Sequence, residues 1–346
     1  MSELITLTID GVTIKANHGT TVLRAALDNG IYIPHLCDHP DLNPVGICRL
    51  CMVEIEGQKP VVSCKTPVEE GMKVTSVSAE LEQIRQVNLE LLVLNHDYNC
   101  QSCTKNSKCK LQEVTRYIGL DEKRFAAMRK PQLDSPLDDS NPYYIRNFDK
   151  CVLCGICVRT CEEIQGDCCI DFAYRGINTK ISVLGDKPII DSTCVTCGEC
   201  VSRCPVGALL PRNDIEPTHE TETVCPFCGC GCGIVVGVRG NEIVSSRAVP
   251  NSPANSGSLC VKGRFGLGFV NSPERLTKPL IRKEGKLVET SWEEALSTIA
   301  QKFEHYRGDQ FATIASAKCT VEDNYVMQKF TRAVMKTNNI DHCARL

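Results

Sequence analysis

The chain has 346 residues and a formal net charge of −3, and 24 of its residues are cysteines. The nearly balanced charge argues against a nucleic-acid-binding surface and against attraction to an anionic membrane. No apolar run approaches the roughly 18 residues needed to span a bilayer, so we expect no direct membrane insertion.

A cysteine content this high is also typical of small disulfide-rich secreted proteins. Such scaffolds are short, however, and this chain opens with MSELITLTIDGVTIKA, which lacks the basic region, apolar stretch and twin-arginine pair of export signals. We therefore expect a cytoplasmic protein whose thiolates bind metal.

Nineteen of the cysteines and one histidine fall into five successive sets of four metal-ligand positions. Spacings of two and three residues bring soft thiolate donors to one centre, as iron–sulfur clusters require. The sequence therefore predicts an α+β multidomain chain with one [2Fe–2S] and four [4Fe–4S] clusters in series. The sets are Cys37/Cys48/Cys51/Cys64, His96/Cys100/Cys103/Cys109, Cys151/Cys154/Cys157/Cys161, Cys194/Cys197/Cys200/Cys204 and Cys225/Cys228/Cys232/Cys260.

Residues 1–78 are predicted to form a β-grasp ferredoxin-like domain. Alternating apolar and polar residues flank the dipeptide Asp10-Gly11, which indicates a β-hairpin. Thr20 or Thr21 can then cap a short helix over residues 22–28. The order strand, strand, helix and cysteine loop is that of a β-grasp ferredoxin, and the long spacing C-x10-C-x2-C-x12-C suits a [2Fe–2S] cluster.

Residues 79–120 are predicted to hold a helix followed by a [4Fe–4S] site with one histidine and three cysteine ligands. A lone histidine is usually a surface or core residue, but three spaced cysteines directly after His96 favour a ligand. Apolar residues at helical spacing predict the face of the helix that packs on a core. They are Leu81, Ile84, Val87, Leu91 and Leu94.

Residues 121–142 are charged and contain prolines, so they are predicted to be a linker. Residues 143–210 follow with two copies of C-x2-C-x2-C-x3-C. In such paired runs the fourth cysteine binds the other cluster, which predicts a ferredoxin domain with two crossed [4Fe–4S] sites. The crossed sets are Cys151/Cys154/Cys157/Cys204 and Cys194/Cys197/Cys200/Cys161.

Residues 211–222 are predicted to be a second, polar linker before an incomplete α/β domain over residues 223–346. A hairpin is expected around Arg239-Gly240-Asn241. Ser291 and Glu294 predict a capping box for a helix from Trp292 to about Tyr306. A strand over 311–315 and a helix over 321–335 then begin a parallel layer.

Five cysteines lie outside the sets, and the simplest interpretation is that they are small buried apolar residues. Spacing alone leaves Cys230 open as an alternative ligand to Cys228. The five are Cys168, Cys169, Cys230, Cys319 and Cys343.

The first four sets, in this order, resemble a module shared by the large iron–sulfur subunit of respiratory complex I, iron-only hydrogenases and some formate dehydrogenases. This resemblance covers residues 1–210 and implies an electron-relay role. The segments CPFCGCGC at 225–232 and GSLCVKGRFG at 257–266 look like the [4Fe–4S] domain of molybdopterin oxidoreductases. In that superfamily a lysine two residues after the last ligand relays electrons to and from the pterin, and Lys262 matches it.

No hydrogenase-type TSCCP motif occurs, whereas residues 324–346 resemble the formate dehydrogenase segment that leads into the metal-binding cysteine or selenocysteine. The resemblance implies oxidation of formate at a molybdenum or tungsten bis-molybdopterin guanine dinucleotide centre in the full-length enzyme. We expect that the chain stops at Leu346 because a selenocysteine codon was read as a stop, and that these 346 residues alone do not turn over formate.

Five centres exceed what one soluble acceptor needs. The sequence therefore predicts a complex with flavin- and NAD(P)-binding diaphorase-type iron–sulfur subunits or with a hydrogenase module. The alternative is a catalytically silent electron-transfer subunit of a complex I-like or hydrogenase-type assembly.

Overall fold

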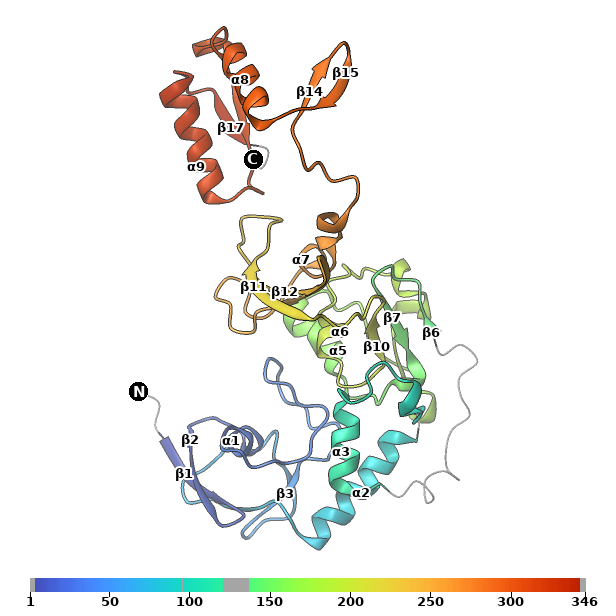
Figure 1. The fold of residues 1–346 in the computed structure, drawn as a ribbon. Coiled ribbons are helices and arrows are strands. Elements are labelled where there is room, and N and C mark those ends of the chain that lie inside the picture. The colour runs from blue at the N-terminus through green and yellow to red at the C-terminus, as the bar shows by residue number, and fades with distance from the viewer. Residues whose placement is uncertain (1–3, 95, 121–136, 343–346) are drawn as a thin grey trace. The chain divides into compact units, whose positions relative to one another are not determined.

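The computed structural model describes residues 4–94, 96–120 and 137–342. The chain divides into two units, Met1–Asp214 and Ile215–Leu346, which are described separately (Figure 1). None of the helices in these ranges is long and apolar enough to cross a membrane.

The first unit begins with a five-stranded mixed sheet in the order β2-β1-β5-β3-β4. Its hairpin turns at Asp10 and Gly11, which both have positive φ, as the sequence predicts. Helix α1 is capped by the side chain of Thr21 and packs its apolar residues on the sheet. The elements are β1 Leu4–Ile9, β2 Val12–Asn17, α1 Val22–Asp28, β3 Met52–Ile55, β4 Val61–Val62 and β5 Lys73–Thr75.

Helix α2 follows, but the predicted packing face is partly wrong. Val87 and Leu91 are exposed, whereas Leu81, Arg85 and Leu89 are buried. Arg85 occupies the buried face because its guanidinium donates to backbone carbonyls, a reason that apolar periodicity does not reveal. The elements are α2 Ala79–Val93, η1 Cys100–Ser102 and α3 Lys110–Ile118.

The rest of the first unit contains two short sheets, and two short helices that lie within the cysteine runs. The prediction that all of 121–142 is a linker is wrong at its end, because Leu137–Asp138 pairs with β7; residues 121–136 lie outside the described ranges. Arg146 of β7 donates to Asp138, which ties this segment to the sheet. The strands are β6 Leu137–Asp138, β7 Tyr144–Asn147, β8 Asp171–Ala173, β9 Lys180–Ser182 and β10 Leu209–Pro211.

The helical segments of this region are short, between three and six residues each. They are η2 Phe148–Lys150, α5 Ile156–Arg159, η3 Thr160–Gln165, η4 Gly176–Asn178, η5 Leu184–Asp186, η6 Ile189–Asp191 and α6 Glu199–Arg203.

The second unit begins with the antiparallel sheet β11-β12-β13, whose turn lies where the sequence predicts it. The prediction of a linker over 211–222 is wrong at both ends, since Pro211 ends β10 and His219–Val224 pairs with β12 along its whole length. The segment forms a strand despite its polar composition, because pairing with β12 satisfies its backbone N–H and C=O groups. The elements are β11 His219–Val224, β12 Gly233–Arg239, β13 Glu242–Ala248, α7 Val261–Phe265 and η7 Gly266–Asn271.

The last part of the second unit has the predicted helix, strand and helix. Ser291 caps α8 by accepting from the Glu294 amide, but the Glu294 carboxylate accepts from the Thr290 hydroxyl, so the predicted box is only half formed. Strand β16 pairs in parallel with β17, so a parallel layer begins here as the sequence predicts. The elements are β14 Leu280–Lys283, β15 Lys286–Glu289, α8 Trp292–Phe303, η8 Gly308–Gln310, β16 Thr313–Ala315, α9 Val321–Lys329, η9 Phe330–Val334 and β17 Ile340–His342.

Candidate metal centres

The first thiol set is the most deeply buried of the five. Its four cysteines, Cys37, Cys48, Cys51 and Cys64, are each 1–2% exposed. The Cys48 amide donates to the Cys37 sulfur at 3.4 Å. The pKa of Cys37 is lowered because the thiols of Cys48 and Cys64 hydrogen-bond to its sulfur. Four thiols in mutual contact and shielded from water are a suitable donor set for a small cluster.

Helix α2 supports the loop that carries this first set. The Arg85 guanidinium donates to the carbonyls of Leu50 and Met52, at 3.1 and 2.6 Å. The Ser63 hydroxyl donates to the Cys51 carbonyl at 2.7 Å. Burial lowers the pKa of Arg85. These bonds satisfy the buried carbonyls around Cys51 and hold the loop in one conformation.

The second set lies around a small hollow that His96, Cys100, Cys103 and Cys109 line together. The buried His96 ring places Nδ1 2.9 Å from the Lys150 carbonyl oxygen. A carbonyl can only accept, so Nδ1 carries the proton and Nε2 keeps its lone pair for a metal. The structure thus places the predicted histidine with the three predicted cysteines.

The third and fourth sets line two separate hollows. The first of these hollows contains Cys204 together with Cys151, Cys154 and Cys157, which is the crossed grouping that the paired motif predicts. The Cys151 sulfur accepts a hydrogen bond from the Leu153 amide at 3.4 Å.

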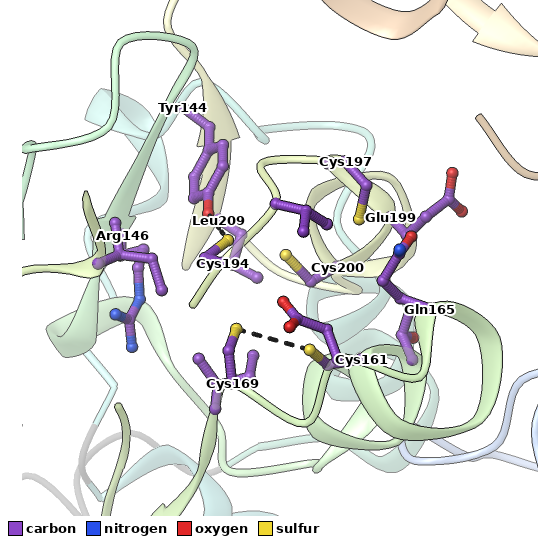
Figure 2. Close-up of a pocket in the computed structure, with 16 residues that line it drawn as sticks. Tyr144, Arg146, Cys161, Gln165, Cys169, Cys194, Cys197, Glu199, Cys200 and Leu209 are labelled. Atoms are coloured by element: carbon purple, nitrogen blue, oxygen red, sulfur yellow. Dashed lines mark hydrogen bonds between the residues drawn. The ribbon is translucent and has the colours of Figure 1, made fainter. Parts of the chain in front are cut away.

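The other hollow contains the sulfurs of a crossed set and one more (Figure 2). Cys161 lies there with Cys194, Cys197 and Cys200, and the Tyr144 hydroxyl is 3.3 Å from the Cys194 sulfur. Cys169 is the additional thiol, and its sulfur is 3.6 Å from that of Cys161.

Cys169 contacts two of the predicted ligands. The pKa of Cys161 is lowered to about 7 and that of Cys194 to about 6, in both cases chiefly because the Cys169 thiol hydrogen-bonds to the sulfur. Sequence reasoning missed Cys169 because Cys168 and Cys169 have none of the spacing of a ligand motif.

The fifth set lies in the second unit. Cys225 is buried, while Cys228 and Cys260 are exposed. The Cys225 amide donates to the Cys232 carbonyl at 2.9 Å, which brings the two ends of the motif together. The Cys230 sulfur is 3.5 Å from the Cys232 sulfur, so Cys230 stays an open alternative to Cys228.

Lys262 lies on α7, two residues after Cys260, and its side chain is exposed. The helix is anchored next to the fifth set, since the Ser246 hydroxyl of β13 donates to the Gly263 carbonyl at 2.8 Å. Lys262 is therefore on the helix that begins directly after the last cysteine of the fifth set, at the position that the resemblance indicates for a relay lysine.

The interpretation of the spare cysteines as buried apolar residues is wrong for most of them. Cys168, Cys230 and Cys319 are exposed, and Cys343 lies outside the described residues. Cys169 is half-buried, in the hollow that Cys161, Cys194, Cys197 and Cys200 also line, hereafter the fourth-centre hollow. The chain reaches these positions through turns and cluster loops, where there is no core to bury a thiol.

Two buried arginines connect the first set to the two-cluster region. Arg159 donates to the carbonyl of Asn43 at 2.6 Å and also to the carbonyl of Cys37. Arg203 donates to the Asp41 carboxylate at 2.9 Å. Both arginines lie between cluster cysteines in sequence, so the loop after Cys37 is held against both halves of the paired motif.

The donor sets fit iron–sulfur clusters. In the part of the chain that the structure describes, no cysteine is paired in a disulfide. The three hollows are lined by three thiols with a histidine, by four thiols and by five thiols, and such soft donors match the ligand preference of iron–sulfur clusters.

Comparisons with known proteins agree with this domain content. Segments of the chain match families described as follows: 2Fe-2S iron-sulfur cluster binding domain (residues 2–79), NADH-ubiquinone oxidoreductase-G iron-sulfur binding region (85–124), 4Fe-4S binding domain (187–210), molybdopterin oxidoreductase Fe4S4 domain (218–272) and molybdopterin oxidoreductase (275–346).

Relatives align with almost the whole of this chain. The chain is 38% identical over 352 residues to the NADPH-Fe(3+) oxidoreductase subunit alpha of Geobacter sulfurreducens, covering 99% of this chain and 40% of the relative. It is 33% identical over 389 residues to a Bacillus subtilis protein named as a candidate formate dehydrogenase, with 99% and 40% covered. The chain thus spans about 40% of the length of these relatives.

Solved structures are similar to this chain as well. One of them is a crystal structure of an NAD+-reducing [NiFe]-hydrogenase, with a TM-score of 0.55 and 32% identity over 61% of this chain and 88% of that chain. Together the matches show that the chain joins iron–sulfur segments similar to those of multi-cluster electron-transfer proteins to a segment similar to the molybdopterin oxidoreductases. It carries 2Fe-2S and 4Fe-4S domains and part of a molybdopterin oxidoreductase domain.

Proposed function

We propose that this chain is the relay portion of a formate dehydrogenase, which passes electrons from formate oxidation through five iron–sulfur centres to a partner subunit. The observation that supports the proposal is the fifth thiol set with Lys262, which adjoins molybdopterin-type sequence in the same chain as four relay sets. Formate is the proposed substrate for two reasons. Residues 324–346 resemble the formate dehydrogenase segment that leads into the metal ligand, and a relative that aligns with 99% of this chain is named for that activity.

When bound, a molybdenum or tungsten bis-pterin would supply the two-electron chemistry, and each iron–sulfur cluster would hold one electron. The residues of this chain supply position, charge and shielding. Lys262 adds a positive charge two residues after the last cysteine of the fifth set, and the buried first set excludes water from its thiols. Hydrogen bonds such as Tyr144 to Cys194 set how readily a centre accepts an electron.

Two sites are candidates for the exit of electrons. The first set contacts the two-cluster region through Arg159, and the second set contacts it through His96 and the Lys150 carbonyl. Each is therefore a direct neighbour of the paired centres. The partner in our proposal is a flavin- and NAD(P)-binding diaphorase-type subunit or a hydrogenase module, since relatives are named for NADPH and NAD+ reactions.

The test is a redox titration of the natively purified protein, followed by EPR at low temperature. We expect formate to reduce the centre held by the fifth set, and we expect molybdenum or tungsten in the sample. If formate leaves that centre oxidised, the proposed route is wrong.

A catalytically silent relay subunit is the second candidate. The match of residues 85–124 to the NADH-ubiquinone oxidoreductase-G region and the similarity to the hydrogenase structure favour it. NAD(P)H or hydrogen would then reduce the clusters in the assembled complex, whereas formate would not. Absence of both molybdenum and tungsten from the native protein would support this candidate.

A further inference from the structure

The fourth-centre hollow, which holds the crossed set of the fourth centre, contains one cysteine sulfur more than the four that bind a [4Fe–4S] cluster. Cys161, Cys194, Cys197 and Cys200 complete the crossed set, and Cys169 is present as well (Figure 2). A carboxylate oxygen of Asp167 and the sulfurs of Cys161 and Cys169 all lie within 4.8 Å of one another.

The fold brings Cys169 back to Cys161 by a tight reversal. The π-type segment Thr160–Gln165 ends at Gly166, which has positive φ, and Cys168 also has positive φ. The Asp167 amide donates to the Cys161 carbonyl at 3.1 Å and closes the turn. The Cys169 side chain is therefore held by the backbone on the same side as Cys161.

The separation of the two sulfurs has a direct chemical meaning. Two thiolates bonded at about 2.3 Å to one tetrahedral metal have sulfurs roughly 3.8 Å apart. The sulfurs of Cys161 and Cys169 are 3.6 Å apart. A single iron position is thus within bonding reach of either cysteine.

We propose that Cys169 is a second, interchangeable ligand for the iron that Cys161 binds in the fourth centre. In the exchange, the bond from iron to the Cys161 sulfur breaks as the bond to the Cys169 sulfur forms. The proton of the incoming thiol passes to the leaving thiolate, and no iron changes its oxidation state. This inference rests on the proposed [4Fe–4S] centre at this site.

The test compares the full chain, reconstituted anaerobically, with the variants C161A, C169A and C161A/C169A and with the exposed-neighbour control C168A. Iron and sulfide content and the EPR spectrum of the fourth centre are measured. We expect C161A, C169A and C168A to keep the wild-type iron content, with a changed fourth-centre spectrum in C161A. The double variant should lose about four iron atoms.

The proposal is overturned if the single variant C161A already loses those four iron atoms. It is also overturned if the double variant C161A/C169A retains them. A wild-type chain that lacks this cluster would instead refute the centre itself, and with it the proposed function. If the alanine variants do not fold, C161S and C161S/C169A repeat the comparison with a side chain close in size to cysteine. Equal iron content and identical spectra in that pair overturn the proposal.

Discussion

Arg159 makes a sharp prediction about how the first thiol set is held. The side chain is buried and donates to the carbonyls of Cys37 and Asn43, so Arg159→Met removes both bonds. Hydrogen bonds from a charged donor contribute about 1.5–3 kcal/mol each, or roughly 3–6 kcal/mol for the pair.

Part of that stabilisation is offset in the wild-type protein. The Arg159 Nε is buried with no hydrogen-bond partner in the described structure, which costs about 1–3 kcal/mol, and methionine removes this cost. The expected net loss is therefore about 2–3 kcal/mol in the local stability of the loop at 38–47.

Native-state hydrogen exchange measured by mass spectrometry is the assay for this loop. A loss of 2–3 kcal/mol corresponds to exchange about 30- to 150-fold faster in peptides that span residues 38–47. The matched control is Arg116→Met on α3, because Arg116 is exposed and the same change in side chain leaves the loop untouched. Unchanged exchange in Arg159→Met would refute the reasoning.

Three further predictions concern single residues. Arg85→Met leaves two buried carbonyls of the first cluster loop without their donor, which should lower the stability of that loop by about 2–5 kcal/mol. The urea concentration at which half of the first cluster is released should therefore fall, and an unchanged midpoint would contradict this. Gly207→Ala would bring a methyl group to 2.7 Å from the Cys103 sulfur, so iron analysis should show a loss of about four atoms; full iron content would count against a cluster at the second set. Tyr144→Phe removes a hydrogen bond to Cys194 worth about 1 kcal/mol, so EPR titration should find the potential of the fourth centre lower by about 40 mV, and an unchanged or higher potential would argue against it.

Local features of the fold could be predicted from the sequence because they depend on nearby residues. The turn at Asp10-Gly11 requires positive φ at both residues, and Thr21 and Ser291 cap helices that begin directly after them. The crossed grouping of Cys204 with the first ferredoxin run follows from motif spacing alone. In each case the determining residues lie in one short segment or one repeated motif.

Other features depended on contacts between distant segments. Arg85 belongs to the buried face of α2 because two carbonyls 33 and 35 residues away require a donor, and no periodicity of apolar residues contains that information. The supposed linker at 219–222 became a strand because β12 offers unpaired backbone groups along its edge.

The order and spacing of residues along the chain are enough to predict the chemistry of this protein: five sets of soft donors at cluster spacing, followed by molybdopterin-type sequence. Which additional groups reach those donors depends on the folded backbone. Cys169 lies outside every motif, yet the reversal after Gln165 brings its sulfur to 3.6 Å from that of Cys161. Spacing along the chain defines a ligand motif, but bond-forming distance depends on how the backbone turns in space.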